Sequence, residues 1–171
     1  MALGGNDLVV GSGGNDTICL GSGTDVVLAG EGSDSIFGEW GRDLISGDEG
    51  RDTIDGGPGG DEIWGDVMAQ DRAAPRCRQP GDRSRTGAAD KIQGGDGADV
   101  IHGQGGDDRP SSGGKLGGGR QVDHICGGYG NDWLEGGPVE DDNVLDGGPG
   151  TDFCSKGPRP NGDIRIDCEK K

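Results

Sequence analysis

The chain has 171 residues; 41 are glycine, 28% are hydrophobic and 4% are aromatic, and the formal net charge at pH 7 is −16. So few apolar side chains exclude a thick hydrophobic core, and composition alone would indicate a disordered chain. The acidic excess argues against nucleic acid or an anionic membrane surface as a partner and favours a cation. No stretch approaches the roughly 18 apolar residues of a membrane span. The opening MALGGND shows no signal peptide.

An aspartate recurs every nine residues from Asp7 to Asp61. Glycine stands two residues before each of these aspartates, and a β-branched residue stands two residues after it. Glycine suits tight turns and β-branched residues suit strands. Each unit therefore predicts a turn, an aspartate and a three-residue strand that is stable only when stacked on its neighbours. The residues expected to point inward are Val9, Ile18, Val27, Ile36, Ile45, Ile54 and Ile63.

The repeat divides the chain into two blocks. Residues 1–66 form the first block, with seven units in register, and residues 67–89 form a basic, irregular insert. A solvated excursion is the favoured interpretation of so long an insert. Residues 90–152 form a second, degenerate block with a break at 109–122, and residues 153–171 form a C-terminal tail.

The second block departs from the pattern at several positions. Proline is poor in a paired strand, yet Pro110 occupies an inward position. Asn143 falls where the aspartate of the last full unit is expected. The turn glycine is replaced by Ala88, Gln121 and Val139 ahead of Asp90, Asp123 and Asp141.

The segments GGDGADVIH, GGYGNDWLE and GGPGTDFCS resemble the nonapeptide GGxGxDxUx of the RTX, or haemolysin-type, calcium-binding repeat. The resemblance implies an all-β fold, a right-handed parallel β-roll with two nonapeptides per coil, here interrupted by two irregular insertions. It also implies that Ca²⁺ binds between turns stacked one coil apart. Alternate units then share one edge of the roll, and the first block contains five pairs of aspartates 18 residues apart.

The resemblance implies a ligand set of aspartate carboxylates and turn carbonyls. The implied carboxylate ligands are Asp7, Asp16, Asp25, Asp34, Asp43, Asp52, Asp61, Asp99, Asp108, Asp132 and Asp152, with Asp90, Asp123 and Asp141 as weaker candidates. The implied backbone carbonyl ligands are Gly14, Gly23, Gly32, Gly41, Gly50 and Gly59.

Elementary chemistry favours the same cation. Calcium takes six to eight oxygen ligands and accepts mixed carboxylate and carbonyl shells. Without a cation, two carboxylates about 5 Å apart at an effective dielectric constant of about 20 repel each other by roughly 3 kcal/mol. We therefore expect the metal-free chain to be largely unfolded and calcium to drive folding. For a single aspartate an Asx-turn would be the simpler interpretation, but seven in register favour the metal.

The five cysteines show no CxxC spacing, so they do not indicate a zinc site. Cys154 and Cys168 are the best disulfide candidates, and they would close the tail into a loop of about 15 residues. Two unpaired thiols are the alternative. No pairing is predicted for Cys19, Cys77 and Cys126.

No catalytic motif stands out. HExxH and GxSxG are absent, and His102 and His124 are the only histidines. We therefore predict a non-catalytic, extracellular calcium-binding module. One alternative is the C-terminal β-roll of a larger secreted hydrolase or toxin, with an N-terminal domain or a cell-surface partner outside this sequence. Another is an adhesion or ice-binding solenoid, which the lack of an outward threonine array disfavours.

The aromatics Phe37, Trp40, Trp64 and Trp133 are expected in turns or at outward strand positions, as scattered surface residues.

Overall fold

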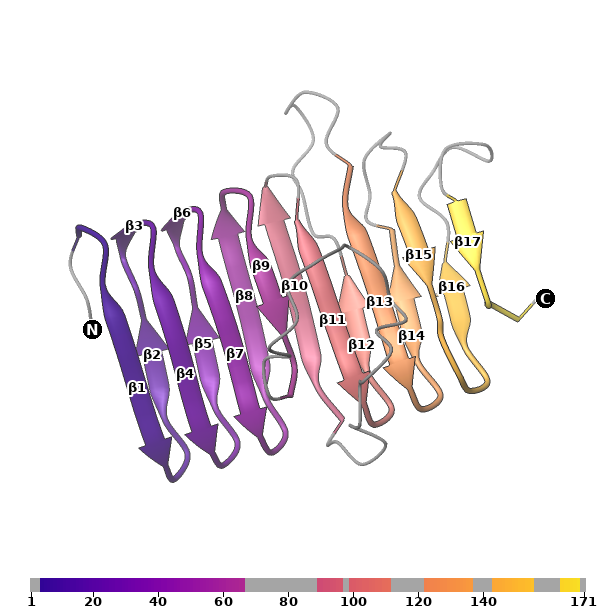
Figure 1. Ribbon diagram of the computed structural model, residues 1–171, viewed down its shortest axis with the longest axis horizontal. Coiled ribbons are helices and arrows are strands. Elements are labelled where there is room, and N and C mark those ends of the chain that lie inside the picture. Colours follow the sequence, from indigo (N-terminus) through magenta and orange to yellow (C-terminus); the bar gives the residue numbers. More distant parts are fainter. Residues whose placement is uncertain are drawn as a thin grey trace.

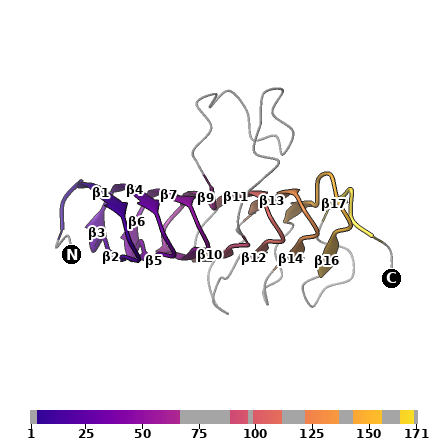
Figure 2. The same cartoon turned by 90° about the horizontal axis from the view of Figure 1, so that it is seen from below.

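The computed structural model describes residues 4–66, 89–96, 99–111, 122–136, 143–155 and 164–169. All regular elements in these ranges are strands, and they stack into two long parallel sheets (Figure 1). Seen from the side, the sheets form the two layers of a flattened rod (Figure 2). In the part of the chain that the structure describes, no helix could cross a membrane.

Sheet A has eight strands and sheet B has seven. Sheet A contains, in spatial order, β1 (Leu8–Gly13), β4 (Val26–Glu31), β7 (Leu44–Glu49), β9 (Glu62–Trp64), β11 (Val100–Gly105), β13 (His124–Tyr129), β15 (Val144–Asp146) and β17 (Ile164–Ile166). Sheet B contains β2 (Thr17–Cys19), β5 (Ser35–Phe37), β8 (Thr53–Pro58), β10 (Lys91–Asp96), β12 (Arg109–Ser111), β14 (Trp133–Glu135) and β16 (Phe153–Ser155). A third sheet pairs β3 (Ser22–Gly23) with β6 (Trp40–Gly41).

The register of the sheets follows the repeat. Residues two nonapeptides apart lie side by side, as Val27 does with Ile45. The same register continues past the insert, where Ile54 pairs with Ile92 although 38 residues separate them in sequence. The two blocks therefore form one continuous stack, and the predicted parallel β-roll is confirmed.

The core consists of apolar side chains that both sheets direct into the space between them. Ile36, Ile45 and Ile63 have no exposed surface, whereas Val9 in the first coil is only partly buried. Stacking thus buries residues that no single coil could bury alone. The core also includes Ile18, Leu20, Val27, Ala29, Ile54, Ile92, Ile101, Ile125, Leu134, Leu145 and Cys154.

Pro110 is accommodated in a paired strand although proline is a poor residue for one. It is buried in β12, which pairs with β10 over its full length. The backbone N–H of Arg109 donates to the Asp90 carbonyl, on the side of β10. Because N–H groups alternate sides along a strand, the side on which Pro110 lacks an N–H is the side of β14. Accordingly, the pairing of β12 with β14 is limited to Ser111 and Glu135.

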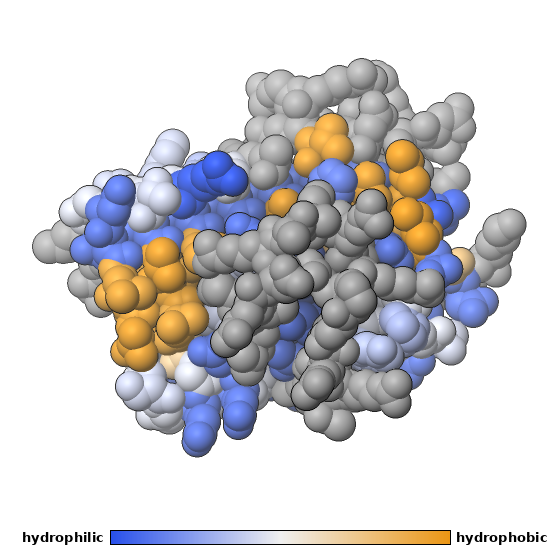
Figure 3. All heavy atoms as spheres, in the orientation of Figure 1, coloured by the Kyte–Doolittle hydropathy of each residue, from blue (hydrophilic) through white to orange (hydrophobic). Residues whose placement is uncertain are grey.

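The aromatic residues do not all lie on the surface as expected. Trp64 is only 5% exposed, and its ring stacks on the ring of His102, with 5.7 Å between centroids. Trp40 is 69% exposed. Figure 3 shows an apolar patch at the N-terminal end of sheet A, where Leu8 and Val10 of β1 face outward.

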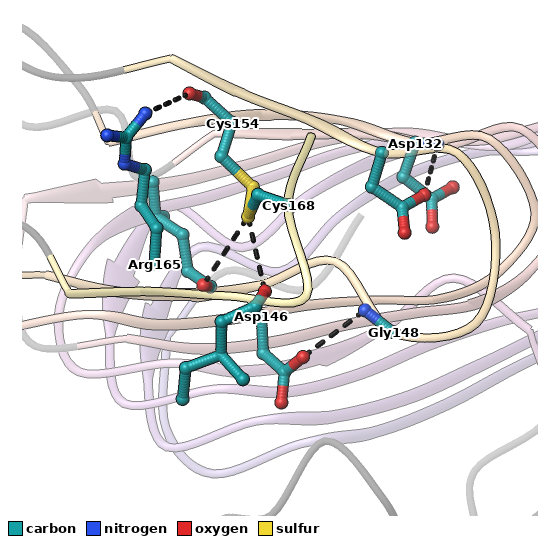
Figure 4. The surroundings of a disulfide bond; sticks show 9 residues. Asp132, Asp146, Gly148, Cys154, Arg165 and Cys168 are labelled. Carbon is teal, nitrogen blue, oxygen red and sulfur yellow. Dashed lines mark hydrogen bonds between the residues drawn. A yellow bond between two sulfur atoms is a disulfide. The ribbon is translucent and has the colours of Figure 1, made fainter. Parts of the chain in front are cut away.

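The C-terminal tail adds strands to the roll, β16 to sheet B and β17 to sheet A. A disulfide joins Cys154 to Cys168, with 5.8 Å between the Cα atoms (Figure 4), which is the pair expected from the sequence. The guanidinium of Arg165 donates to the Cys154 carbonyl at 3.3 Å. Cys126 is also disulfide-bonded, and Cys19 is a free thiol.

Candidate metal centre

The repeat aspartates form two rows of stacked side chains, one at each edge of the roll, which we call the first and second aspartate ladders. In each row, the carboxylate Oδ1 accepts a hydrogen bond from the backbone N–H of the aspartate one coil earlier, as Asp43 does from Asp25 at 2.9 Å. The first ladder comprises Asp7, Asp25, Asp43, Asp61, Asp99, Asp123 and Asn143. The second comprises Asp16, Asp34, Asp52, Asp90, Asp108, Asp132 and Asp152.

Local sequence explains why the ladders form. Each aspartate stands between the turn and the strand, so its backbone already belongs to the parallel ladder; for example, the Asp25 carbonyl accepts from the Leu44 amide at 2.9 Å. Stacking in register then brings each side chain beside the amide of the previous coil. The five aspartate pairs predicted for the first block are all neighbours in these ladders.

The two weaker candidates that the structure describes occupy ladder positions like the others. Asp90 accepts from the amide of Asp52 at 2.8 Å, and Asp123 accepts from the amide of Asp99 at 2.9 Å. Loss of the turn glycine therefore does not displace the carboxylate. Asp141 lies outside the described residues, and Asn143 holds the next position in its row.

The second carboxylate oxygen, Oδ2, is left without a hydrogen-bond partner. Buried carboxylate oxygens are normally paired, because leaving one unsatisfied is costly. One or two such atoms could be accidental, but this set repeats at nearly every ladder position. The buried, unpartnered Oδ2 atoms belong to Asp16, Asp25, Asp34, Asp43, Asp52, Asp61, Asp90, Asp99, Asp108, Asp132 and Asp152.

The unpartnered oxygens lie beside glycines of the strands, close to backbone carbonyl oxygens. A Cβ added to Gly47 would lie 2.4 Å from the Asp52 Oδ2 and 2.4 Å from the Gly65 carbonyl oxygen. The same holds at Gly127, between the Asp132 Oδ2 and the carbonyl of Gly147. A carboxylate oxygen and a backbone carbonyl oxygen thus both pack against the Cα of each of these glycines, where a side chain would not fit.

The turn glycines predicted as carbonyl ligands form two further rows. A Cβ on Gly41 would lie 1.6 Å from the Gly23 carbonyl oxygen, so each carbonyl points along the roll axis at the next turn. Gly14, Gly32 and Gly50 form one row in this way, and Gly23, Gly41 and Gly59 form the other. The predicted carbonyls therefore lie between stacked turns.

A family model for the RTX calcium-binding nonapeptide repeat (4 copies) matches residues 1–27, 20–54, 37–67, 86–110 and 117–154, which is more than half of the sequence. The chain belongs to this RTX family. Comparisons with curated proteins and with solved structures found no match. RTX membership implies calcium binding, and the oxygen-lined ladders fit that ion.

The composition of the RTX ladders suits a hard cation. Among the described residues, no three His, Cys, Asp or Glu side chains converge on one metal position. The carboxylates come from single-file rows, and the other oxygens of the stacked turns are backbone carbonyls. Calcium accepts such mixed oxygen shells, whereas zinc prefers nitrogen and sulfur.

Burial makes the metal-free RTX ladders electrostatically unfavourable. Burial raises the pKa of Asp61 to about 7, that of Asp90 to about 8 and that of Asp132 to about 7. The hydrogen bond from the preceding coil lowers each pKa, and neighbouring ladder carboxylates raise it. At neutral pH, without a cation, the folded chain has to accommodate ionised carboxylates that its interior disfavours.

Asn143 shows what the ladder position needs. Its Oδ1 accepts from the amide of Asp123 at 2.9 Å, as an aspartate would. Its Nδ2 stands in place of the second oxygen and donates to the carbonyl of Gly136 at 2.7 Å. At this one position the RTX ladder supplies a hydrogen-bond donor from the chain itself. At the ladder aspartates with a buried, unpartnered Oδ2, no such hydrogen bond forms.

Proposed function

We propose that this protein is an extracellular module that folds when its aspartate ladders bind calcium and that has no catalytic activity of its own. The observation that supports it most is the repeated set of buried, unpartnered Oδ2 atoms beside backbone carbonyls. We propose that the aspartates with a buried, unpartnered Oδ2, together with Asp7 and Asp123, are the carboxylate ligands of calcium. The carbonyl oxygens of the turn glycines complete the coordination shell of each ion.

The two carboxylate oxygens of an aspartate have different roles in the proposed binding. Oδ1 of each aspartate after the first in its row accepts a hydrogen bond from the coil before it, and we assign Oδ2 to the ion. The side chain therefore has little freedom to lose on binding, and each ligand comes already oriented. A bound divalent cation supplies the positive charge that the buried carboxylates lack, so binding and stacking stabilise each other.

Two observations support an extracellular setting. RTX repeats are typical of secreted proteins, and the Cys154–Cys168 disulfide suits an oxidising compartment. Extracellular calcium modules bind weakly, with dissociation constants of about 10⁻⁴ to 10⁻³ M. Sites of that strength fill outside a cell and stay empty inside it.

The proposed absence of catalysis rests on how the two histidines are placed. His102 stacks on Trp64, and both His102 and His124 lie on outward strand positions of sheet A, whose inward residues are Ile101 and Ile125. Neither joins the ladders. Attachment to a larger secreted hydrolase or toxin is the second candidate, because RTX membership is compatible with it.

The test is a titration of the purified full chain with CaCl₂ followed by far-UV circular dichroism, with MgCl₂ as the control. We expect a cooperative rise of β signal at sub-millimolar to millimolar calcium and none with magnesium. A spectrum that is fully β-rich in excess EDTA at pH 7.5, and that calcium does not change, would overturn calcium-triggered folding.

A further inference from the structure

A shallow hollow on the outer face of sheet B is unrelated to the aspartate ladders. It has a volume of about 510 Å³ and lies over β10, β12 and β14, which are neighbours in the sheet (Figure 1). No ladder aspartate lines it. We call it the sheet B groove, and its lining residues are Lys91, Ile92, Gln93, Arg109, Pro110, Ser111, Trp133 and Glu135.

Two positively charged side chains line the groove without an ion-pair partner among the described residues. Lys91 and Arg109 lie directly opposite each other on β10 and β12, and both are exposed. Like charges directly opposite on neighbouring strands destabilise a sheet. Neither side chain makes an ion pair with any residue in the described ranges, although the whole chain carries a net charge of −16. A positive pair of this kind is complementary to an anionic ligand.

The next strand adds an oriented aromatic ring. Trp133 is 43% exposed, and its Nε1 donates to the Glu135 carboxylate at 3.0 Å. Its ring packs against Phe153 of β16, with 4.3 Å between the centroids. These contacts fix the indole, so that one part of it remains available to a ligand beside the two cations. The polar side chain of Gln93 lies on the same face.

The arrangement of the sheet restricts the ligand class. β10 is paired with both β8 and β12, and β12 is paired with both β10 and β14. The groove therefore offers no free strand edge to an extended peptide. The net charge of −16 opposes a long polyphosphate such as nucleic acid. An aromatic face next to cations and hydrogen-bonding side chains suits a ring that carries hydroxyls and a carboxylate.

We propose that the sheet B groove binds an acidic saccharide, with its carboxylate at Lys91 and Arg109 and its sugar ring against Trp133. Charge-assisted hydrogen bonds to the carboxylate provide specificity for the anion. This inference goes beyond calcium binding, because it needs the stacked strands but none of the ladder oxygens as ligands.

The test uses the full chain in calcium and a galacturonate trisaccharide, which is too short to be cross-linked by calcium into a gel. Isothermal titration and tryptophan fluorescence measure binding, with the neutral maltotriose as the control sugar. We expect the acidic trisaccharide to bind and the neutral one to bind at least tenfold more weakly. The double variant Lys91→Gln/Arg109→Gln and the variant Trp133→Ala should each weaken binding roughly tenfold or more.

Arg51→Gln is the matched control, because it removes one exposed positive charge outside the groove. Circular dichroism in calcium verifies that each variant is folded, which also separates failure of this proposal from failure of calcium-triggered folding. Equal affinity for both sugars, or equal losses in Arg51→Gln and the groove variants, would overturn the proposal. Tighter binding of a glutamate-rich peptide than of the trisaccharide would do the same.

Discussion

At the scale of single residues, one atom distinguishes Asn143 from the aspartates at other ladder positions. Asn143 and Asp132 both accept a backbone amide on Oδ1, at 2.9 and 2.8 Å respectively. They differ at the second terminal atom: Nδ2 of Asn143 donates to a carbonyl, whereas Oδ2 of Asp132 has no partner. In the proposed function, a bound cation would do at the aspartates what this amide does within the chain.

The variant Asn143→Asp should gain a calcium site. An Oδ2 in place of Nδ2 would face the Gly136 carbonyl oxygen, and the repulsion between the two oxygens would be relieved by a cation that both coordinate. We expect the amount of calcium bound at equilibrium dialysis against saturating calcium, measured by plasma mass spectrometry, to rise by about one ion per chain. The converse variant Asp132→Asn should lower it. An unchanged calcium content in both variants would contradict the role assigned to these atoms.

At the scale of the element, the turns are constrained by close approach rather than by φ alone. Gly14 and Gly41 both have positive φ, 110° and 145°. A Cβ on Gly14 would meet nothing within 4 Å, whereas a Cβ on Gly41 would lie 1.6 Å from the Gly23 carbonyl oxygen. The two positions therefore separate conformational strain from steric overlap between coils.

The substitutions Gly14→Ala and Gly41→Ala should differ in cost. Gly14→Ala carries only the penalty for a left-handed backbone, about 1–2 kcal/mol. Gly41→Ala also forces neighbouring turns apart, so its free energy of unfolding should fall by clearly more. Urea unfolding at saturating calcium measures both. Equal decreases in the free energy of unfolding would show that neighbouring turns are not packed as closely as in the structure.

The last strands also depend on a covalent link. The Cys154–Cys168 disulfide joins β16 to the segment that follows β17. A loop of about 15 residues closed by a disulfide is stabilised by about 3 kcal/mol, so Cys154→Ser should lower the urea midpoint accordingly. Cys19→Ser is the control, because Cys19 is a free thiol. Similar midpoints for the two variants would show that the link adds little.

At the scale of the whole molecule, buried carboxylates make the metal-free state sensitive to pH. The pKa of Asp61 is raised from 3.8 to about 7 and that of Asp90 to about 8. The folded chain without metal therefore binds more protons than the unfolded chain between about pH 4 and pH 8. Its free energy of unfolding falls as pH rises through this window, and is highest at the acid end.

Acid should therefore partly replace calcium. In buffer stripped of divalent ions, we expect the β signal in circular dichroism to be weak at pH 8 and to grow as the pH is lowered toward 5. Calcium affinity should fall over the same range, because protons compete for the carboxylates. A metal-free β signal that decreases on acidification over this window would contradict the assigned burial of the ladders.

Much of the fold and of the candidate site could be predicted from the sequence. A strict period of nine encodes the strand, the inward residue and the aspartate together, because each coil repeats the neighbour that it stacks on. The spacing alone is therefore enough to assign Ile45 to the core and Asp43 to the edge of the roll. The Cys154–Cys168 pair was also predictable, since the length of the loop between the two cysteines favoured it.

Only the tertiary structure decided the contacts that break the period. Stacking continues the register across the insert, so Asp52 contacts Asp90, 38 residues away. It also places β14 on the side of β12 where Pro110 lacks an N–H. Asn143 acquires its role from Gly136, and Lys91 meets Arg109 only because their strands are neighbours. A repeating sequence determines which positions stack, since that information is local and periodic. The atoms that meet where the repeat fails are set by the three-dimensional packing of strands that the sequence holds apart.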